Sequence, residues 1–169
     1  ALVDSLDKPV GSVRITAAEH AVRTVLWPKV SVLLSDNPGI KVEINIDYGL
    51  RDIVAQRYDA GVRLGEQVEK DLIAVRIRPD MRMAVVGSPS YFAGRSVPNT
   101  PQDLTEHNCI NLRFPTYGGL YAWEFEKEGQ EVNVRVEGQL VFNSSAPVLN
   151  AALAGLGLGY VPEDMVETA

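Results

Sequence analysis

Hydrophobic and polar residues in the first half of the chain switch repeatedly between two spacings. In residues 11–17, Val13 and Ile15 alternate with polar side chains, which predicts a strand with one buried face. Apolar side chains in residues 22–34 recur at helical spacing and form one stripe. The elements predicted in this half are strand 11–17, helix 22–34, strand 42–46, helix 50–58 and strand 60–64. Strands that alternate with helices are typical of a parallel sheet with helices on its faces.

Two proline positions bear on the first helix. Pro28 lies within the helical stripe and has no N–H to donate, so we expect it to bend the helix or to mark its first turn. Asn37, Pro38 and Gly39 form a turn signal that ends the helix.

The second half has a different order of elements. Residues 73–87 have the pattern of a long strand that is interrupted at Pro79. Ser88 before Pro89 and Thr100 before Pro101 are typical of the first turn of a helix. The remaining elements predicted are strand 109–114, a hairpin with its turn at 127–130, strand 140–142, helix 145–156 and strand 158–161.

These patterns predict an α/β protein with two lobes. Residues 1–10 lead into the first subdomain, residues 11–86, and residues 87–160 form the second. The second lobe shows no core of typical domain size in its pattern. We therefore expect it to pack across the first lobe, with a ligand-binding crevice between the two.

Net charge and cysteine content narrow the classes of function. The formal net charge at pH 7 is −6. Nucleic-acid-binding domains draw most of their affinity from basic surfaces, so this charge argues against direct DNA contact by this chain. No apolar run is long enough to span a bilayer, and the first seven residues lack the basic and apolar regions of a secretory signal. The single cysteine, Cys109, excludes an internal disulfide and fits a reducing compartment.

Gly155, Gly157 and Gly159 have the composition of a nucleotide-binding loop but the wrong context. The dinucleotide fingerprint needs its glycines after a strand and before a helix. Here they follow a predicted helix and precede a predicted strand. We therefore predict a glycine C-cap and a tight helix-to-strand turn.

The titratable residues form no recognisable catalytic or metal-binding pattern. The two histidines, His20 and His107, lie in no triad pattern, and Cys109 is interpreted as a small buried residue of a strand. One cysteine and two distant histidines do not make a set of metal ligands. We expect neither an enzyme nor a cofactor.

Polar residues do gather where a parallel sheet would bind a ligand. Open α/β sheets bind ligands at the carboxyl ends of their strands, next to the starts of helices. The predicted strand ends carry Ala18, Glu19 and His20, Arg63 and Leu64, Arg113 and Phe114, and Asn143 and Ser144. This composition suits a small polar or anionic ligand, and capping residues with surface arginines would give the same pattern.

The order of several short motifs resembles the effector-binding domain of LysR-type transcriptional regulators. The motifs are Gly11-Ser12-Val13-Arg14-Ile15-Thr16, Trp27-Pro28, Asn37-Pro38-Gly39, Asp59-Ala60-Gly61-Val62-Arg63-Leu64-Gly65, Gly87-Ser88-Pro89-Ser90-Tyr91, Thr100-Pro101-Gln102-Asp103-Leu104 with His107, Trp123, and Ala154-Gly155-Leu156-Gly157-Leu158-Gly159 with Pro162. No single motif is specific, but the ordered set covers nearly the whole chain. The motifs at Asp59 and Ser88 are most similar to the CrgA-like branch of the family.

The resemblance implies a type 2 periplasmic-binding-protein fold, with two Rossmann-like subdomains joined by two crossover strands. In this family a winged helix-turn-helix and a linker helix precede the domain. Residues 1–10 would then end the linker, and the DNA-binding part would be absent from this chain. A further strand and helix usually follow the second crossover, so residues 161–169 would be a truncated return toward the first subdomain.

The resemblance also implies a mechanism. A small-molecule effector binds between the subdomains, changes the geometry of a homodimer or homotetramer and so controls transcription in the cytoplasm, away from any membrane. RNA polymerase is a further partner that the resemblance allows. The cleft positions carried over onto this chain are Ala18, Glu19, His20, Arg63, Leu64, Arg113, Phe114, Asn143 and Ser144.

One cleft position departs from the family pattern. Many family members place Ser or Thr at the position of Ala18 to bind a ligand carboxylate. Ala18 has no hydroxyl and Glu19 follows it, so we hypothesise that Arg63 or Arg113 supplies the charge contact. The alternative from another class is a solute-binding receptor of a transport system, which shares the fold. An upstream helix-turn-helix would exclude that receptor, and a secretory signal would favour it.

Overall fold

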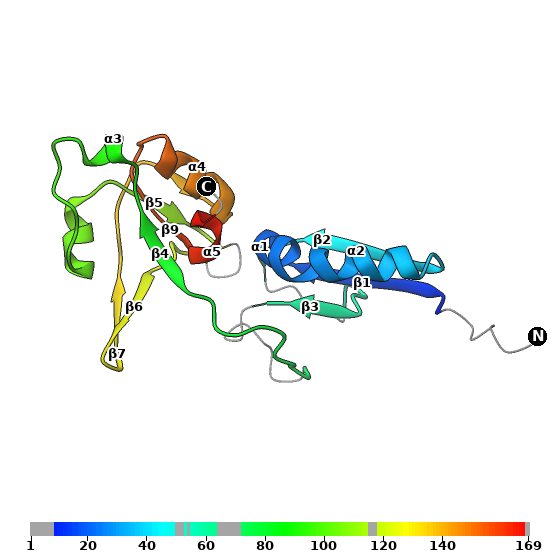
Figure 1. The fold of residues 1–169 in the computed structure, drawn as a ribbon. Helices are drawn as coiled ribbons and strands as arrows, with labels where there is room; N and C mark the ends of the chain where they lie inside the picture. Colours follow the sequence, from blue (N-terminus) through cyan, green and yellow to red (C-terminus); the bar gives the residue numbers. More distant parts are fainter. Residues whose placement is uncertain (1–8, 50–52, 54, 64–71, 115–117, 168–169) are drawn as a thin grey trace, which may run out of the picture. The chain divides into compact units, whose positions relative to one another are not determined.

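The computed structural model describes residues 9–49, 53, 55–63, 72–114 and 118–167. The chain divides into two compact units, Ala1–Pro79 and Asp80–Ala169. Figure 1 shows the elements of each unit.

Three parallel strands form the sheet of the first unit, in the order β2-β1-β3. The strands are β1, Gly11–Ala17; β2, Ile40–Ile46; and β3, Ala60–Val62. The register places Val13 beside Val42 and Ile15 beside Ile44, so one face of the sheet is apolar, as the alternation predicts. The helical run after β1 lies along this sheet (Figure 1). The predicted strand-helix-strand order is confirmed.

The helical run of the first unit contains a widened turn in front of Pro28. It consists of α1 (Glu19–Ala21), the π-helical turn η1 (Val22–Leu26) and α2 (Trp27–Asp36). The Trp27 N–H bonds to the Val22 carbonyl, five residues back instead of four. In a regular α-helix the Pro28 ring would crowd the carbonyl four residues back. Pro28 lies in the first turn of α2, which is one of the two predicted outcomes.

The segment before β3 ends in a closed turn. The Tyr58 N–H bonds to the Ile53 carbonyl at 2.8 Å, and Arg57 is left-handed, with φ of 57°. This combination commonly ends a helix. The described residues 53 and 55–57 form a turn, and residues 50–52 and 54 of the predicted helix lie outside the described part.

The strand predicted over residues 73–87 is shorter in the structure. β4 is Met83–Val86, and residues 73–82 are paired in none of the sheets of the described chain. Ile73 and Val75 have exposed fractions of 96% and 75%. The prediction is wrong for residues 73–82. An alternating pattern indicates which side chains of a strand would share a face, but it does not provide a partner strand. A strand also needs a neighbouring backbone for its N–H and carbonyl groups, and of residues 73–87 only residues 83–86 pair with β9.

A mixed four-stranded sheet forms the centre of the second unit, in the order β4-β9-β5-β8. The further strands are β5, Cys109–Leu112; β8, Val141–Phe142; and β9, Leu158–Pro162. β4 is antiparallel to β9, whereas β9, β5 and β8 are parallel. The subdomain limits predicted from the sequence, 11–86 and 87–160, count β4 with the first lobe, whereas the division into units falls before it. Those limits remain a prediction.

A separate hairpin pairs β6 (Trp123–Lys127) with β7 (Gln130–Val134). Its two turn residues, Glu128 and Gly129, both have positive φ, 54° and 77°. This geometry is typical of a two-residue type I′ turn, which matches the right-handed twist of the strands. The predicted hairpin is confirmed.

The second unit has a hydrophobic cluster on each face of its sheet. Successive side chains of β5 point to opposite faces of the sheet, so Cys109 belongs to the first cluster and Ile110 to the second. The hairpin covers the first cluster, where Trp123 stacks on Tyr160 with ring centroids 5.3 Å apart. Helix α4 (Ser145–Leu153) covers the second. The expectation that this lobe has no core of its own is therefore wrong.

Two predicted helix starts are confirmed. At α3 (Pro89–Phe92) the Ser88 hydroxyl accepts the Tyr91 N–H. At the 3-10 helix η3 (Pro101–Glu106), Thr100 and Asp103 form a reciprocal capping box.

The glycine-rich segment after α4 is a helix-to-strand turn, as predicted. Gly155 has φ of 80°, and the Leu156 N–H bonds to the Ala151 carbonyl. These two features form a glycine C-cap. The chain then enters β9 and the short helix α5 (Glu163–Val166).

Leu158→Ala is expected to destabilise the second unit. Leu158 is 0% exposed, and removing a buried leucine side chain leaves a cavity that lowers the free energy of unfolding by about 2–5 kcal/mol. Urea unfolding followed by circular dichroism measures this change. The matched control is Leu156→Ala, because Leu156 is 53% exposed and should change stability by less than about 0.5 kcal/mol. Equal losses in the two variants would contradict the assigned burial.

Candidate ligand-binding site

Three parallel strands end at one edge of the first sheet. The last residues of β1, β2 and β3 are Ala17, Ile46 and Val62. Because parallel strands share one direction, the residues that follow them gather at the same edge. The predicted site residues found there are Ala18, Glu19, His20 and Arg63. Leu64, the fifth predicted residue of this lobe, lies outside the described residues.

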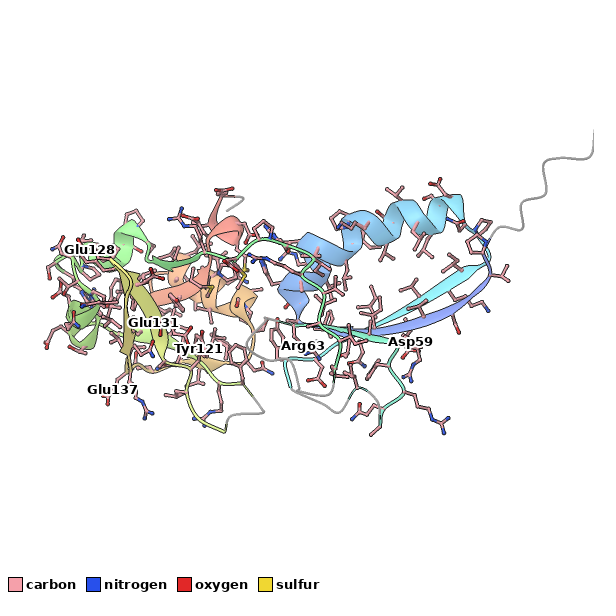
Figure 2. The ribbon with its side chains drawn as sticks, turned by 90° about the horizontal axis from the view of Figure 1, so that it is seen from below. Asp59, Arg63, Tyr121, Glu128, Glu131 and Glu137 are labelled. Atoms are coloured by element: carbon pink, nitrogen blue, oxygen red, sulfur yellow. The ribbon has the colours of Figure 1, made fainter. Side chains whose placement is uncertain are left out.

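Arg63 is a half-buried cation at this edge (Figure 2). Its guanidinium donates to the Val62 carbonyl and the Thr16 hydroxyl, both at 2.9 Å, and to the Gly49 carbonyl at 3.4 Å. All three acceptors are neutral oxygens. Partial burial lowers the pKa of Arg63, and the nearby Asp47 carboxylate acts in the opposite direction. A guanidinium remains protonated in proteins, so Arg63 places a positive charge at an edge that also carries the Asp47 and Glu19 carboxylates.

Sequence reasoning missed Thr16 and the loop after β2. Thr16 is 1% exposed, and its hydroxyl holds Arg63. In the loop, the Asp47 N–H bonds to the Ala17 carbonyl at 3.0 Å, and the Tyr48 hydroxyl lies 3.5 Å from a Glu19 carboxylate oxygen. The loop could have been predicted as part of the site from its position after the predicted strand 42–46. The residues that follow any strand of a parallel sheet lie at its carboxyl edge.

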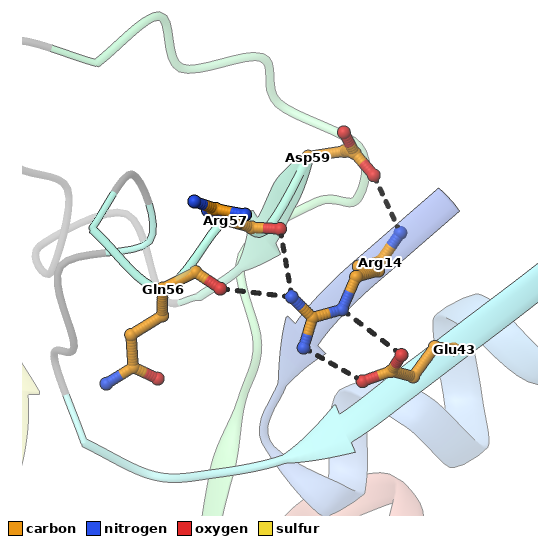
Figure 3. A network of polar contacts seen from close by, with 5 residues as sticks. All are labelled: Arg14, Glu43, Gln56, Arg57 and Asp59. Carbon is orange, nitrogen blue, oxygen red and sulfur yellow. Dashed lines mark hydrogen bonds and ion pairs between the residues drawn. The ribbon is translucent and has the colours of Figure 1, made fainter. Parts of the chain in front are cut away.

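Arg14 ties the start of β3 to the other two strands (Figure 3). Its guanidinium forms two 3.1 Å hydrogen bonds with Glu43, its neighbour across the β1–β2 pair. A further nitrogen donates to the carbonyls of Gln56 and Arg57 at 3.1 and 3.2 Å. The Asp59 carboxylate accepts the Arg14 N–H at 2.8 Å, and the Asp59 N–H bonds to the Arg14 carbonyl at 2.9 Å. The chain is therefore fixed to β1 just before it enters β3.

The second unit gathers the other predicted residues at an edge of its own sheet. β5 and β8 are parallel and end side by side. The predicted site residues that follow these strands are Arg113, Phe114, Asn143 and Ser144. The two groups of predicted residues belong to different units, so a cleft between them remains a prediction.

Arg113 differs from Arg63 in its surroundings. It is exposed, and its guanidinium donates to the Gly118 carbonyl at 2.8 Å. Its backbone pairs with Leu120 in an isolated bridge. Phe114 packs edge to face against Tyr121, with ring centroids 5.4 Å apart. The Arg113 side chain is thus engaged with the Gly118 backbone at the surface.

An apolar cavity of about 420 Å³ lies elsewhere in the second unit. Its walls include Val85, Phe92, Leu149, Leu153 and Leu158. None of the predicted site residues of the described chain lines it, and its walls carry no charged side chain. It does not have the groups needed to recognise an anion, so we assign the candidate site to the sheet edges.

The described residues contain no group of three or more His, Cys, Asp or Glu that could hold a metal ion. His107 is engaged in the fold, with its Nδ1 3.1 Å from the Tyr91 hydroxyl. Cys109 is 0% exposed, and burial raises the pKa of its thiol to about 12. None of the described helices has the length and apolar character needed to cross a membrane.

Polar residues at the carboxyl ends of parallel strands are typical of α/β domains that bind ligands. The chain belongs to the family described as LysR substrate binding domain, whose model matches residues 7–169. The resemblance seen in the sequence is thereby confirmed. The family and the relatives named below are regulators, not enzymes.

Two curated relatives extend over nearly the whole chain. A putative transcriptional regulator of Pseudomonas aeruginosa is 56% identical over 158 residues, which cover 94% of this chain and 52% of the relative. The HTH-type transcriptional regulator PgrR of Escherichia coli is 48% identical over 168 residues, which cover 99% of this chain and 56% of the relative. The chain therefore spans about half the length of these relatives.

Solved structures of two regulators share the fold. The full-length Vibrio cholerae virulence activator AphB matches with a TM-score of 0.78 and 22% identity, over 94% of this chain and 53% of AphB. CrgA of Neisseria meningitidis matches with a TM-score of 0.76 and 22% identity, over 95% of this chain and 53% of CrgA.

Cys109 is expected to be unreactive in the folded chain. The thiolate is the reacting form, and a buried thiol with a pKa of about 12 scarcely forms it at pH 8. Titration with Ellman's reagent at pH 8 should detect almost no free thiol in buffer and one equivalent in guanidinium chloride. Rapid labelling of the native chain would contradict the assigned burial.

Proposed function

We propose that this chain is the effector-sensing part of a LysR-type DNA-binding transcriptional regulator. The two curated relatives are named as transcriptional regulators and are 56% and 48% identical to it, which supports a regulator over a solute-binding receptor. A net charge of −6 is compatible with this role if a helix-turn-helix domain outside this chain contacts the DNA. Such a regulator acts in the cytoplasm.

The proposed mechanism is a shift between two arrangements of the subdomains. The effector binds between them and has a higher affinity for one arrangement, so it raises the population of that arrangement. In a homodimer or homotetramer this shift changes the spacing of the DNA-binding domains and their relation to RNA polymerase.

The observation that best supports an effector site is the position of Arg63. This residue is half-buried at the carboxyl edge of a parallel sheet and is pre-oriented by Thr16. Arg113 is exposed, where ion pairs contribute little to binding. We therefore propose Arg63 as the main contact to an anionic effector group. The proposed cleft also includes Ala18, Glu19, His20 and Leu64 from the first subdomain and Arg113, Phe114, Asn143 and Ser144 from the second.

Arg63→Ala is expected to weaken effector binding by roughly ten- to a hundredfold, since a hydrogen bond to a charged group contributes about 1.5–3 kcal/mol. A thermal-shift screen over amino acids, aromatic acids and small metabolites supplies the ligand, because a specific ligand raises the melting temperature. Isothermal titration then measures its affinity. Arg135→Ala removes an exposed arginine outside the proposed cleft, so it is the matched control and should change the affinity less than about threefold. Unchanged affinity in Arg63→Ala would overturn the proposed site.

A further inference from the structure

The carboxyl edge of the first sheet carries an acidic group as well as a basic one. Glu19 follows β1, separated from it by Ala18, and Arg63 directly follows β3. β1 and β3 are paired and parallel, with Ala17 beside Val62. The two charged residues are therefore held by neighbouring strand ends within the same unit.

One short loop contacts both of these residues. The Tyr48 hydroxyl lies 3.5 Å from a Glu19 carboxylate oxygen, and the carbonyl of the next residue, Gly49, lies 3.4 Å from the Arg63 guanidinium. The loop itself is anchored, because the Asp47 N–H bonds to the Ala17 carbonyl at 3.0 Å and the Gly49 N–H bonds to the Asp47 carboxylate at 2.8 Å. Glu19 and Arg63 thus flank the same anchored loop.

The hydrogen bonds orient both side chains. The three oxygens to which Arg63 donates are neutral, and the nearby Asp47 carboxylate also acts on its charge. A bound anion would add a charge-assisted hydrogen bond to the guanidinium. The Tyr48 hydroxyl can donate to the Glu19 carboxylate at 3.5 Å and so helps to orient it. Glu19 is only partly exposed, so its charge is less screened than that of a fully solvated carboxylate.

We propose that the effector is a zwitterion, an amino acid or short peptide whose carboxylate binds Arg63 and whose ammonium binds Glu19. This inference rests on the proposed effector site and specifies the chemical class of its ligand. A ligand that carries only negative charge would gain the contact with Arg63 but would be repelled by Glu19. Opposite charges flanking one loop therefore select for a ligand with both groups.

The test compares free ligands with blocked forms of the same compounds. The probes are alanine, glutamate, phenylalanine and the dipeptide Ala-Ala, together with their N-acetyl and C-amide derivatives. Thermal shift and isothermal titration on the full chain should show binding of at least one free form and weaker binding, by about tenfold or more, of both of its blocked forms. No response to any free form at 10 mM would overturn the proposal, and so would equal binding of a free form and its N-acetyl derivative.

Glu19→Gln separates the ammonium contact from the anion contact. In this variant the affinity for the free form should fall about tenfold, while the affinity for its N-acetyl derivative stays the same or rises. Arg63→Ala should weaken both. Glu131→Gln, on the hairpin of the second unit (Figure 2), makes the same chemical change away from the site and should leave both affinities unchanged. Circular dichroism confirms that each variant folds.

The outcomes distinguish the two proposals. If Arg63→Ala weakens binding but Glu19→Gln affects free and N-acetylated ligands equally, the anion site holds and the zwitterion is overturned. If Arg63→Ala leaves every affinity unchanged, the proposed site itself fails.

Discussion

The position of Arg63 depends on how β3 is held beside β1. β3 has only three residues, so its own ladder of hydrogen bonds is short. Arg14 compensates for this, because its planar guanidinium reaches Glu43 on one side and two turn carbonyls on the other. Thr16, two residues further along β1 and on the same face, binds Arg63 beyond the other end of β3. One face of one strand therefore fixes both ends of β3.

The fold was predictable where the determinants are local. The strand around Val13, the hairpin turn at Glu128 and the glycine cap at Gly155 each follow from a few neighbouring residues, and all three are confirmed. Residues 73–82 were predicted wrongly because their alternation says nothing about a partner strand. The core of the second lobe was missed for a related reason, since Trp123 and Tyr160 meet only after the hairpin folds onto the sheet.

The candidate site was predicted as two sets of strand ends, and the structure gathers each set within its own unit. The contact between Arg63 and Thr16 was not predictable from spacing, because the two residues are 47 positions apart and meet only if β1 lies beside β3. The same holds for Tyr48 and Glu19, which are 29 positions apart. Patterns along a chain indicate which residues leave a strand, whereas strand order decides which of them become neighbours.

The burial of Cys109 has a practical consequence for measuring movement in this chain. Its only native thiol is enclosed, so a maleimide probe would react with cysteines placed by design and would leave Cys109 unmodified. Lys29 in α2 and Glu131 in β7 are exposed and lie in different units, and both are suitable for replacement by cysteine. A pair of spin labels at these positions would give a distance distribution with and without effector. Distances between the two units could therefore be measured by pulsed electron-spin methods without first replacing Cys109.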